Sequence, residues 1–290
     1  MKKLLIVMAI VNAIFAPAVV AGVTVGGEMR YEITDDDSGT EFDNNGSILT
    51  VDGSEDLGDG LKAGFYTKIT GIGGNSTIGS GNTYLNLSGS MGKIQFGQFH
   101  LPSKEVLKMA ELHGDTAGKE VVFANTLEPN QQIQYATPSI GGVTVKVSVV
   151  SGDVDAGSGT DYELDGNVSN VAIYYDSGPL SVAYATLKGN DGTADATALG
   201  LKYTMDDLKL VAAYEDVEDA ADATVIGASY NVGNGNSIAV TSQSQSLDVN
   251  EKNTIALNHA FSARTRAYLM FNHPKQGGNN STVIGFKHKF

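Results

Sequence analysis

The 290-residue chain has no cysteine, no tryptophan and only six prolines. Without cysteine it has no disulfide, so an exported form must take its stability from a large, internally hydrogen-bonded sheet. Basic residues are also scarce, 19 against 33 acidic residues, and the resulting negative charge argues against nucleic acid as a partner. After the first 21 residues, no stretch approaches the roughly 18 uninterrupted apolar residues of a membrane-spanning helix. Any membrane spanning must therefore be done by strands.

The N-terminal segment has the pattern of a secretory signal peptide. Lys2 and Lys3 precede a short apolar run over residues 4–16, and small residues stand before the expected cleavage point. We therefore expect a signal peptide at residues 1–21 and one mature domain at residues 22–290. Removing Lys2 and Lys3 from the 19 basic residues leaves 17 against 33 acidic ones, a net charge of −16. That charge predicts a surface that attracts cations, although acidity that merely keeps an exported protein soluble explains the sign equally well.

The mature chain alternates apolar and polar residues with a period of two, and helical periodicity is nearly absent. In the last strand, Ile284, Phe286 and Phe290 alternate with glycine or lysine. A strand that ends on the terminal residue has no capping tail, so both of its edges must be paired to prevent aggregation. Closing the sheet into a barrel removes all free edges, and we infer that this chain is closed in that way.

Short turns alternate with longer connections along the whole chain, which is typical of an up-and-down transmembrane barrel. The long connections are acidic or rich in glycine and cover residues 35–46, 71–81, 152–167, 189–196, 217–224, 247–253 and 273–281. Counting strands between them predicts an all-β, antiparallel barrel of about 16 strands, with 14 or 18 still possible. No change in composition marks a second domain.

Four segments resemble the general porins of Gram-negative bacteria. Residues 54–63 (SEDLGDGLKA) are similar to their first periplasmic turn, and residues 133–142 (IQYATPSIGG) to the hairpin between their sixth and seventh strands. Residues 84–89 and 285–290 resemble their fourth and last strands. The resemblance implies a 16-stranded barrel in the outer membrane, usually a homotrimer, surrounded by lipid and lipopolysaccharide. It also implies passive diffusion of small hydrophilic solutes, and a terminal Phe290 read by the barrel-assembly machinery.

In porins the third outer loop folds into the barrel and narrows it. Here the longest connection is His100–Asn130, which we call loop 3. The resemblance makes it the acidic side of a constriction, and the candidate carboxylates are Glu105, Glu111, Asp115 and Glu120. Ser103–Leu112 is expected to form a short helix with Ser103 as its N-cap. The loop lacks the Pro-Glu-Phe-Gly-Gly sequence of some relatives, and these carboxylates could equally solvate a surface loop.

A basic barrel wall opposite loop 3 is also implied by the resemblance. The alternation of side chains gives Arg30, Lys62, Lys68, Lys146 and Lys209 as candidates, while Gln134 stands where relatives often carry arginine. A field between an acidic loop and a basic wall would orient dipolar solutes. Together with the net charge, this favours a mild cation preference, whereas each cation taken alone is as readily explained as a solvated lumen residue.

The sequence gives little reason to expect a metal, a cofactor or an enzyme. Asp153, Asp155 and Asp161 are weak candidates for a loop cation site, but their spacing departs from an EF-hand. The five histidines lack the spacing of zinc ligands, and no catalytic triad or phosphate-binding loop is present.

Two other functions remain open at this point. One is a substrate-selective outer-membrane channel with a saturable site for sugars, phosphate or dicarboxylates. The other is a secreted β-rich adhesin, which would need an apolar interior and a polar exterior.

Overall fold

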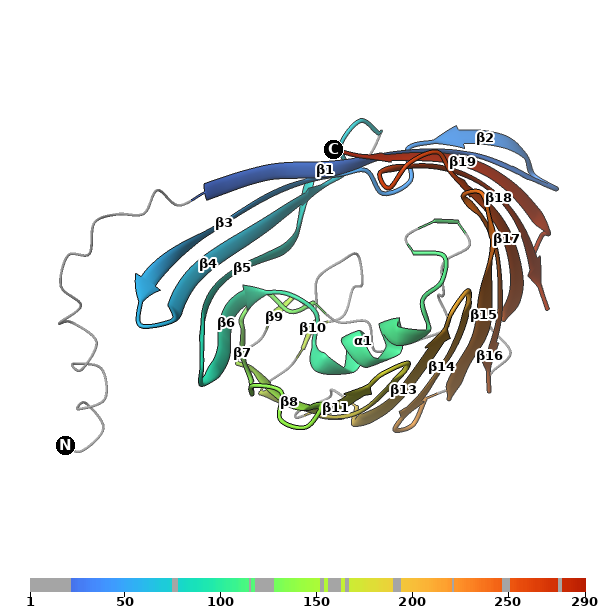
Figure 1. Ribbon diagram of the computed structural model, residues 1–290. Coiled ribbons are helices and arrows are strands. Elements are labelled where there is room, and N and C mark those ends of the chain that lie inside the picture. The colour runs from blue at the N-terminus through green and yellow to red at the C-terminus, as the bar shows by residue number, and fades with distance from the viewer. Residues whose placement is uncertain are drawn as a thin grey trace, which may run out of the picture.

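A computed structural model describes residues 22–74, 78–114, 116–117, 128–151, 154–155, 163–164, 167–189, 194–220, 222–246, 251–275 and 278–290. The expected signal peptide lies outside these ranges. The strands form one closed antiparallel sheet in which each strand pairs with the next and the last pairs with the first (Figure 1).

The barrel strands are β1 (Gly22–Asp36), β2 (Gly39–Asp43), β3 (Ile48–Gly58), β4 (Leu61–Thr70), β5 (Gly79–Gly89), β6 (Gly92–Gln98), β7 (Gln132–Ala136), β8 (Val143–Val150), β11 (Val168–Ser177), β12 (Leu180–Lys188), β13 (Ala196–Met205), β14 (Leu208–Val217), β15 (Ala223–Gly233), β16 (Asn236–Gln245), β17 (Lys252–Ala260), β18 (Thr265–Pro274) and β19 (Ser281–Lys289). Because β2 and β3 pair with successive parts of β1, they occupy one position in the barrel, which therefore has 16 strands as predicted. A separate pair, β9 (Val154–Asp155) and β10 (Glu163–Leu164), lies in a connection.

The long connection expected over residues 35–46 contains a strand hairpin that was not predicted. β1 continues to Asp36, and β2 turns back to pair with it. The turn forms because the Asp36 side chain accepts a hydrogen bond from the Ser38 backbone N–H at 2.7 Å, a local closure typical of aspartate.

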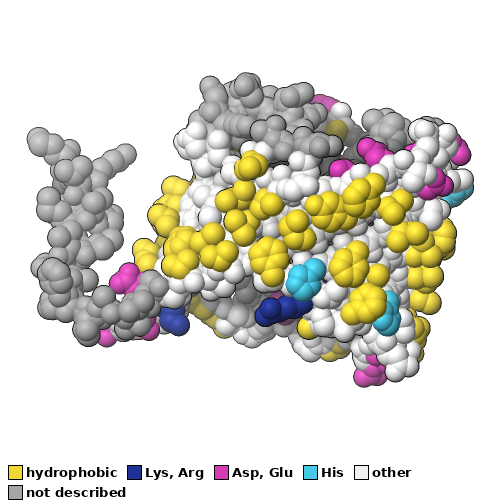
Figure 2. All heavy atoms as spheres, turned by 90° about the horizontal axis from the view of Figure 1, so that it is seen from above, with side chains coloured by type: hydrophobic (Ala, Val, Ile, Leu, Met, Phe, Trp, Pro, Cys, Tyr) yellow, Lys and Arg dark blue, Asp and Glu magenta, His cyan; other side chains and the backbone are white. Residues whose placement is uncertain are grey.

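The side chains of β1 show how the two faces of the barrel differ. Glu28, Arg30 and Glu32 point into the lumen and are at most 6% exposed, whereas Val23 and Val25 point outward and are about 60% exposed. Hydrophobic side chains form a band on the outer surface, as Figure 2 shows. An apolar exterior around a polar interior is the reverse of what a soluble adhesin needs. Among the described residues, no helix is long and apolar enough to cross a membrane.

The terminal strand is paired on both edges, as its pattern predicted. β19 pairs with β18 and with β1, and beyond it Phe290 exchanges two backbone hydrogen bonds with Gly27, of 3.1 and 3.2 Å. Gly27 is required at this seam, because a Cβ there would lie 2.5 Å from the Phe290 ring and 2.6 Å from the Ile48 carbonyl O. The barrel is thus closed by the pairing of β19 with β1, which Phe290 extends by one residue.

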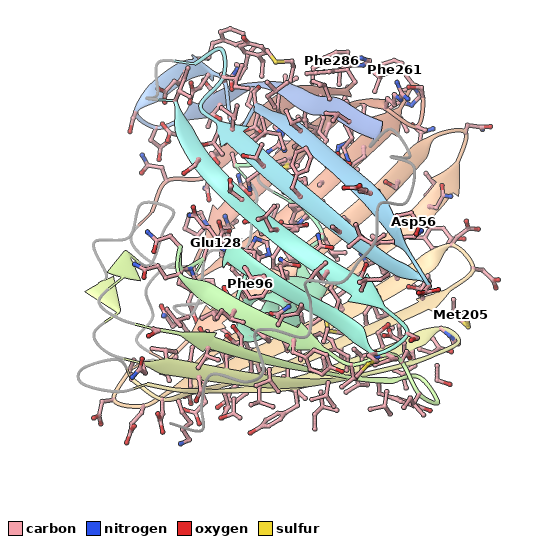
Figure 3. The ribbon with its side chains drawn as sticks, turned by 90° about the vertical axis from the view of Figure 1, so that its left-hand side faces the viewer. Asp56, Phe96, Glu128, Met205, Phe261 and Phe286 are labelled. Atoms are coloured by element: carbon pink, nitrogen blue, oxygen red, sulfur yellow. The ribbon has the colours of Figure 1, made fainter. Side chains whose placement is uncertain are left out.

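The short turns gather at one end of the barrel. Asp56 and Met205, which stand just before two of these turns, lie at the same end in Figure 3. Loop 3 leaves β6 near the opposite end and contains α1 (Pro102–Leu107) and the 3₁₀ turn η2 (Lys108–Ala110). Figure 1 shows α1 inside the ring of strands.

Candidate functional site

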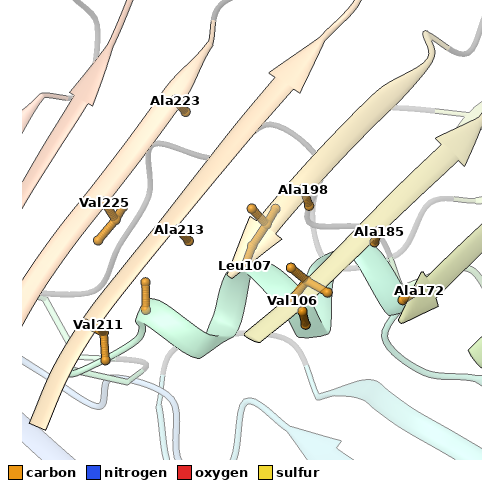
Figure 4. Close-up of a cluster of buried hydrophobic side chains, with 11 residues drawn as sticks. Val106, Leu107, Ala172, Ala185, Ala198, Val211, Ala213, Ala223 and Val225 are labelled. Atoms are coloured by element: carbon orange, nitrogen blue, oxygen red, sulfur yellow. The ribbon is translucent and has the colours of Figure 1, made fainter. Parts of the chain in front are cut away.

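Loop 3 packs on the lumen face of β11 to β15 through an apolar contact. Val106, Leu107 and Ala110 are at most 2% exposed and lie on a cluster of small wall residues (Figure 4). The members of this cluster on the wall are Ala172, Ala183, Ala185, Ala198, Val211, Ala213, Ala223 and Val225. Gly200 also makes room, since a Cβ there would lie 2.5 Å from the Val106 carbonyl O. The small side chains on this part of the wall make room for the loop. The opposite part of the wall stays open to the pore.

The expected helix is shorter than predicted and has another start. α1 begins at Pro102, and Leu101 takes the N-cap position without a side-chain hydrogen bond. Ser103 is inside the helix, where its backbone N–H donates to the Asn170 side chain at 2.8 Å. Proline at the first helical position needs no N–H partner and has the right φ, so it defines the start in place of serine.

Glu105 is held by the wall beneath the loop. Its carboxylate forms an ion pair with Lys146 and lies 3.1 Å from the Tyr174 hydroxyl. The Lys146 ammonium also lies over the Tyr174 ring, 5.0 Å from its centroid. Lys146 was predicted on the wall opposite the loop, but it lies on β8, beneath the start of the loop. Lys146 therefore neutralises most of the negative charge of Glu105.

The two ends of loop 3 are joined by Glu128, which is labelled in Figure 3. Its Oε1 accepts from Lys104 at 2.6 Å and from His100 at 2.9 Å, and the residue is 6% exposed. Burial alone would raise the pKa of Glu128, but the hydrogen bonds from His100 and Lys104 and the charge of Lys104 hold it well below its usual range. The carboxylate is therefore charged and fixes the base of the loop.

Replacing Glu128 by glutamine should loosen the base of loop 3. The exchange leaves the buried Lys104 facing an amide, and breaking such a pair costs on the order of 3 kcal/mol. We expect faster hydrogen exchange at the backbone amides of residues 103–107, measured by mass spectrometry on the folded protein. Glu111→Gln is the matched control, because Glu111 pairs at 3.0 Å with the exposed Lys108 and such pairs contribute little. Equal protection in both variants would contradict the proposed clamp.

The far part of the loop is anchored by Glu32. This carboxylate accepts from the Tyr268 hydroxyl at 2.5 Å, from the Asn45 side chain at 2.5 Å and from the Ala117 backbone N–H at 3.2 Å. Glu32 is 2% exposed, so its three donors replace the water it has lost. Glu32 thus connects β1, β18 and the loop.

His113 adds a second, pH-sensitive anchor. Its Nε2 lies 3.1 Å from the Thr241 Oγ1, and the residue is 2% exposed. Burial, and after it the charges of Lys252 and Arg266, lower the pKa of His113 to about 4. Because the folded loop favours the neutral ring, the stabilisation by His113 is fully present above the usual histidine pKa of 6.5 and is lost as the pH falls towards 4.

Acidification should therefore loosen loop 3 through His113. We expect open-channel current noise to rise as the pH falls from about 6.5 to about 4. In His113→Gln, which cannot titrate, most of this rise should disappear, whereas His259→Gln, a change at an exposed site, should leave it unchanged. A pH dependence that His113→Gln leaves intact would assign the effect to other groups.

The strand register places the basic candidates on the lumen face. Arg30, Lys62 and Lys68 lie on β1 and β4, away from the wall that α1 covers, and Lys209 lies on β14, on the covered side. Gln134 also faces inward and is 5% exposed. These residues are therefore distributed around the barrel and do not form one ladder opposite the loop.

Sequence reasoning missed several lumen cations, among them Lys93, Lys202, Lys252, Arg266, Lys287 and Lys289. Lys287 and Lys289 alternate with Phe286, His288 and Phe290, so the period-two pattern already contained the signal. The alternation in the last strand was used only to predict its lipid-facing side, and the lysines on its other side were not assigned to the lumen.

Several predicted site residues cannot be placed. Asp115, Glu120, Asp153 and Asp161 lie outside the described residues, and Asp155 is described only as part of the β9 backbone. In the described part of the chain, no group of three or more His, Cys, Asp or Glu could hold a metal ion.

Comparison with known proteins identifies similar chains over nearly the whole length. The model of a family described as Gram-negative porin matches residues 5–279. Outer membrane porin protein 32 of Delftia acidovorans is 28% identical over 258 residues, which cover 74% of this chain and 66% of that relative, just under two thirds of its length.

Solved structures show the same fold. The anion-selective porin from Comamonas acidovorans has a TM-score of 0.76 and 22% identity, over 93% of this chain and 100% of that one. A trimer form of OmpT from Vibrio cholerae has a TM-score of 0.66 and 14% identity, over 93% of this chain and 99% of that one. The family match confirms the resemblance seen in the four sequence segments.

Proposed function

The chain belongs to the Gram-negative porin family, and we propose that it forms a water-filled pore for passive diffusion of small hydrophilic solutes and ions. It is a β-barrel of the outer membrane. The proposal rests on the position of loop 3. The loop packs on the inner face of β11 to β15 and narrows an otherwise wide 16-stranded lumen. Small solutes would pass between the loop and the wall of β1 to β6.

The net charge of the whole chain favours a mild preference for cations. The charges beside loop 3 favour the opposite sign. Lys93 and Lys146 lie in one row across β6 to β8, both in register with Ala136, and Glu105 is their nearby counter-charge. Some acidic side chains, by contrast, stand just beyond strand ends, such as Asp206 after β13 and Asp219 after β14. The named likeness to an anion-selective porin supports the same preference, so we propose mild anion selectivity.

We propose that the protein assembles as a trimer, because its fold is similar to that of the OmpT trimer form. The outward surface of the barrel would then divide between subunit contacts and outer-membrane lipid with lipopolysaccharide. Phe290, whose ring is about half exposed beside Gly27, is proposed as the signal read by the barrel-assembly machinery.

Single-channel recording in a planar bilayer tests the pore. We expect large steps with conductance proportional to the salt concentration, and closure in thirds if three pores assemble. Vesicles that contain the protein should swell in small sugars and resist swelling in large oligosaccharides. Absence of conductance from protein that migrates as a folded, heat-modifiable barrel would contradict the proposed function.

A further inference from the structure

A basic hollow lies between β1, β18, β19 and the far side of loop 3. It has a volume of about 420 Å³, and its lining includes Arg30, Arg266, Lys287, Lys289, Lys108 and Glu28. We propose that this hollow is a binding subsite of the pore for small dianionic oxyanions, with inorganic phosphate as the simplest example. The inference rests on the proposed channel function and adds a saturable step to it.

The strand register brings three cations into one row. Arg266 on β18 pairs with Lys287 on β19, and Lys287 pairs with Arg30 on β1. Neighbouring strands lie about 4.8 Å apart, so the row sets the guanidinium groups of Arg266 and Arg30 on either side of the Lys287 ammonium. Arg30 is 3% exposed and contributes its charge, while Arg266 and Lys287 are the more accessible members of the row. Guanidinium groups bind carboxylate and phosphate oxygens in bidentate geometry, and lysine adds a point charge. The row therefore fits an anion with several oxygens.

The nearby carboxylates cancel only part of this charge. Glu28 is paired with Arg30 and, at 2.7 Å, with Lys287, while Glu111 is paired with Lys108. The lining thus holds five basic and two acidic side chains. In the part of the chain that the structure describes, no carboxylate lies within ion-pair distance of Arg266 or Lys289. The excess positive charge favours a dianion over a monovalent ion such as chloride.

Two arginines also carry unused donors. Arg30 is 3% exposed, and its Nε and Nη1 have no hydrogen-bond partner, nor has the Nε of Arg266. Arg266 lies over the Tyr268 ring, 5.6 Å from its centroid, which holds the guanidinium in place. Unpaired donors of a buried guanidinium are costly, and arginine cannot relieve that cost by losing its proton. Their charge therefore persists and reinforces the positive field of the hollow.

Phosphate block of the chloride current tests the subsite. At constant ionic strength and mildly alkaline pH, where inorganic phosphate is mainly dianionic, added phosphate should lower the single-channel chloride conductance with saturation. In Arg266→Gln the half-saturating phosphate concentration should rise at least tenfold, and in Lys289→Gln severalfold. Lys62→Gln, which removes a lumen charge from β4 outside the hollow, should leave it unchanged. Lys289 is exposed, so its variant serves as the test if Arg266→Gln fails to fold.

The outcomes separate this inference from the channel itself. A conducting wild-type pore without saturable block would overturn the subsite and leave the channel standing. Equal weakening in Lys62→Gln would also overturn it, because the block would then reflect the general lumen charge. Absence of conductance would instead overturn the proposed pore.

Discussion

Replacing Val106 by aspartate is expected to detach α1 from the lumen wall without unfolding the barrel. Val106 is fully buried among wall alanines, so an unpaired carboxylate there costs on the order of 4 kcal/mol. Besides this apolar contact, the described part of the loop is held at its base by Glu128 and farther along by Glu32, and the barrel strands keep their own hydrogen bonds. We expect single-channel records with several conductance levels and much higher open-channel noise than in the wild type.

Val106→Ala is the matched control for this prediction. It removes volume without adding charge, which costs about 2 kcal/mol, so the helix should stay on the wall. Heat-modifiable migration on gels establishes that both variants are folded. A Val106→Asp channel with one conductance level and wild-type noise would show that the packed loop does not set the width of the pore.

Replacing Gly27 by valine is expected to open the seam between the first and last strands. A Cβ at this position would lie 2.5 Å from the Phe290 ring and 2.6 Å from the backbone O of Ile48, which cannot move aside without shifting β3. We expect the free energy of unfolding to fall by about 3 kcal/mol, measured by urea titration in detergent micelles. The yield of folded barrel should fall with it.

Gly26→Ala provides the comparison for the seam. A Cβ at Gly26 would lie 3.3 Å from its nearest neighbours, a much smaller overlap that a shift of a few tenths of an ångström relieves. Its effect should stay below that of Gly27→Val by about 2 kcal/mol. Equal stability of both variants would show that the terminal phenylalanine does not lock the barrel.

The strand pattern of this chain could be predicted because the side-chain period of a strand is local. Alternation over residues 282–290 is sufficient to predict which side chains face lipid, and the pairing of β19 with β18 and β1 agrees. The β2 hairpin was missed because its turn depends on one hydrogen bond from Ser38 to Asp36, inside a run that was interpreted as a loop. Because such a turn depends on a single side chain, the sequence carries only a one-residue signal for it.

The arrangement around the pore could be predicted only in part. The register determined which cations face inward, but not that Glu105 pairs with Lys146 or that Glu128 joins the two ends of the loop. These contacts depend on where loop 3 crosses the barrel, and no local pattern encodes that path. Net charge alone does not determine the ion preference, because it counts acidic side chains at strand ends together with those of the lumen.

The reversal potential of the wild-type channel in a potassium chloride gradient tests the central claim most directly, because it reports the sign of the field beside loop 3. The charges around the loop predict an anion-selective sign. In Arg266→Glu, which reverses one charge of the row on β18, β19 and β1, the potential should shift towards cation selectivity. A cation-selective wild-type channel would contradict this prediction. It would indicate that the net charge of the whole chain determines the ion preference.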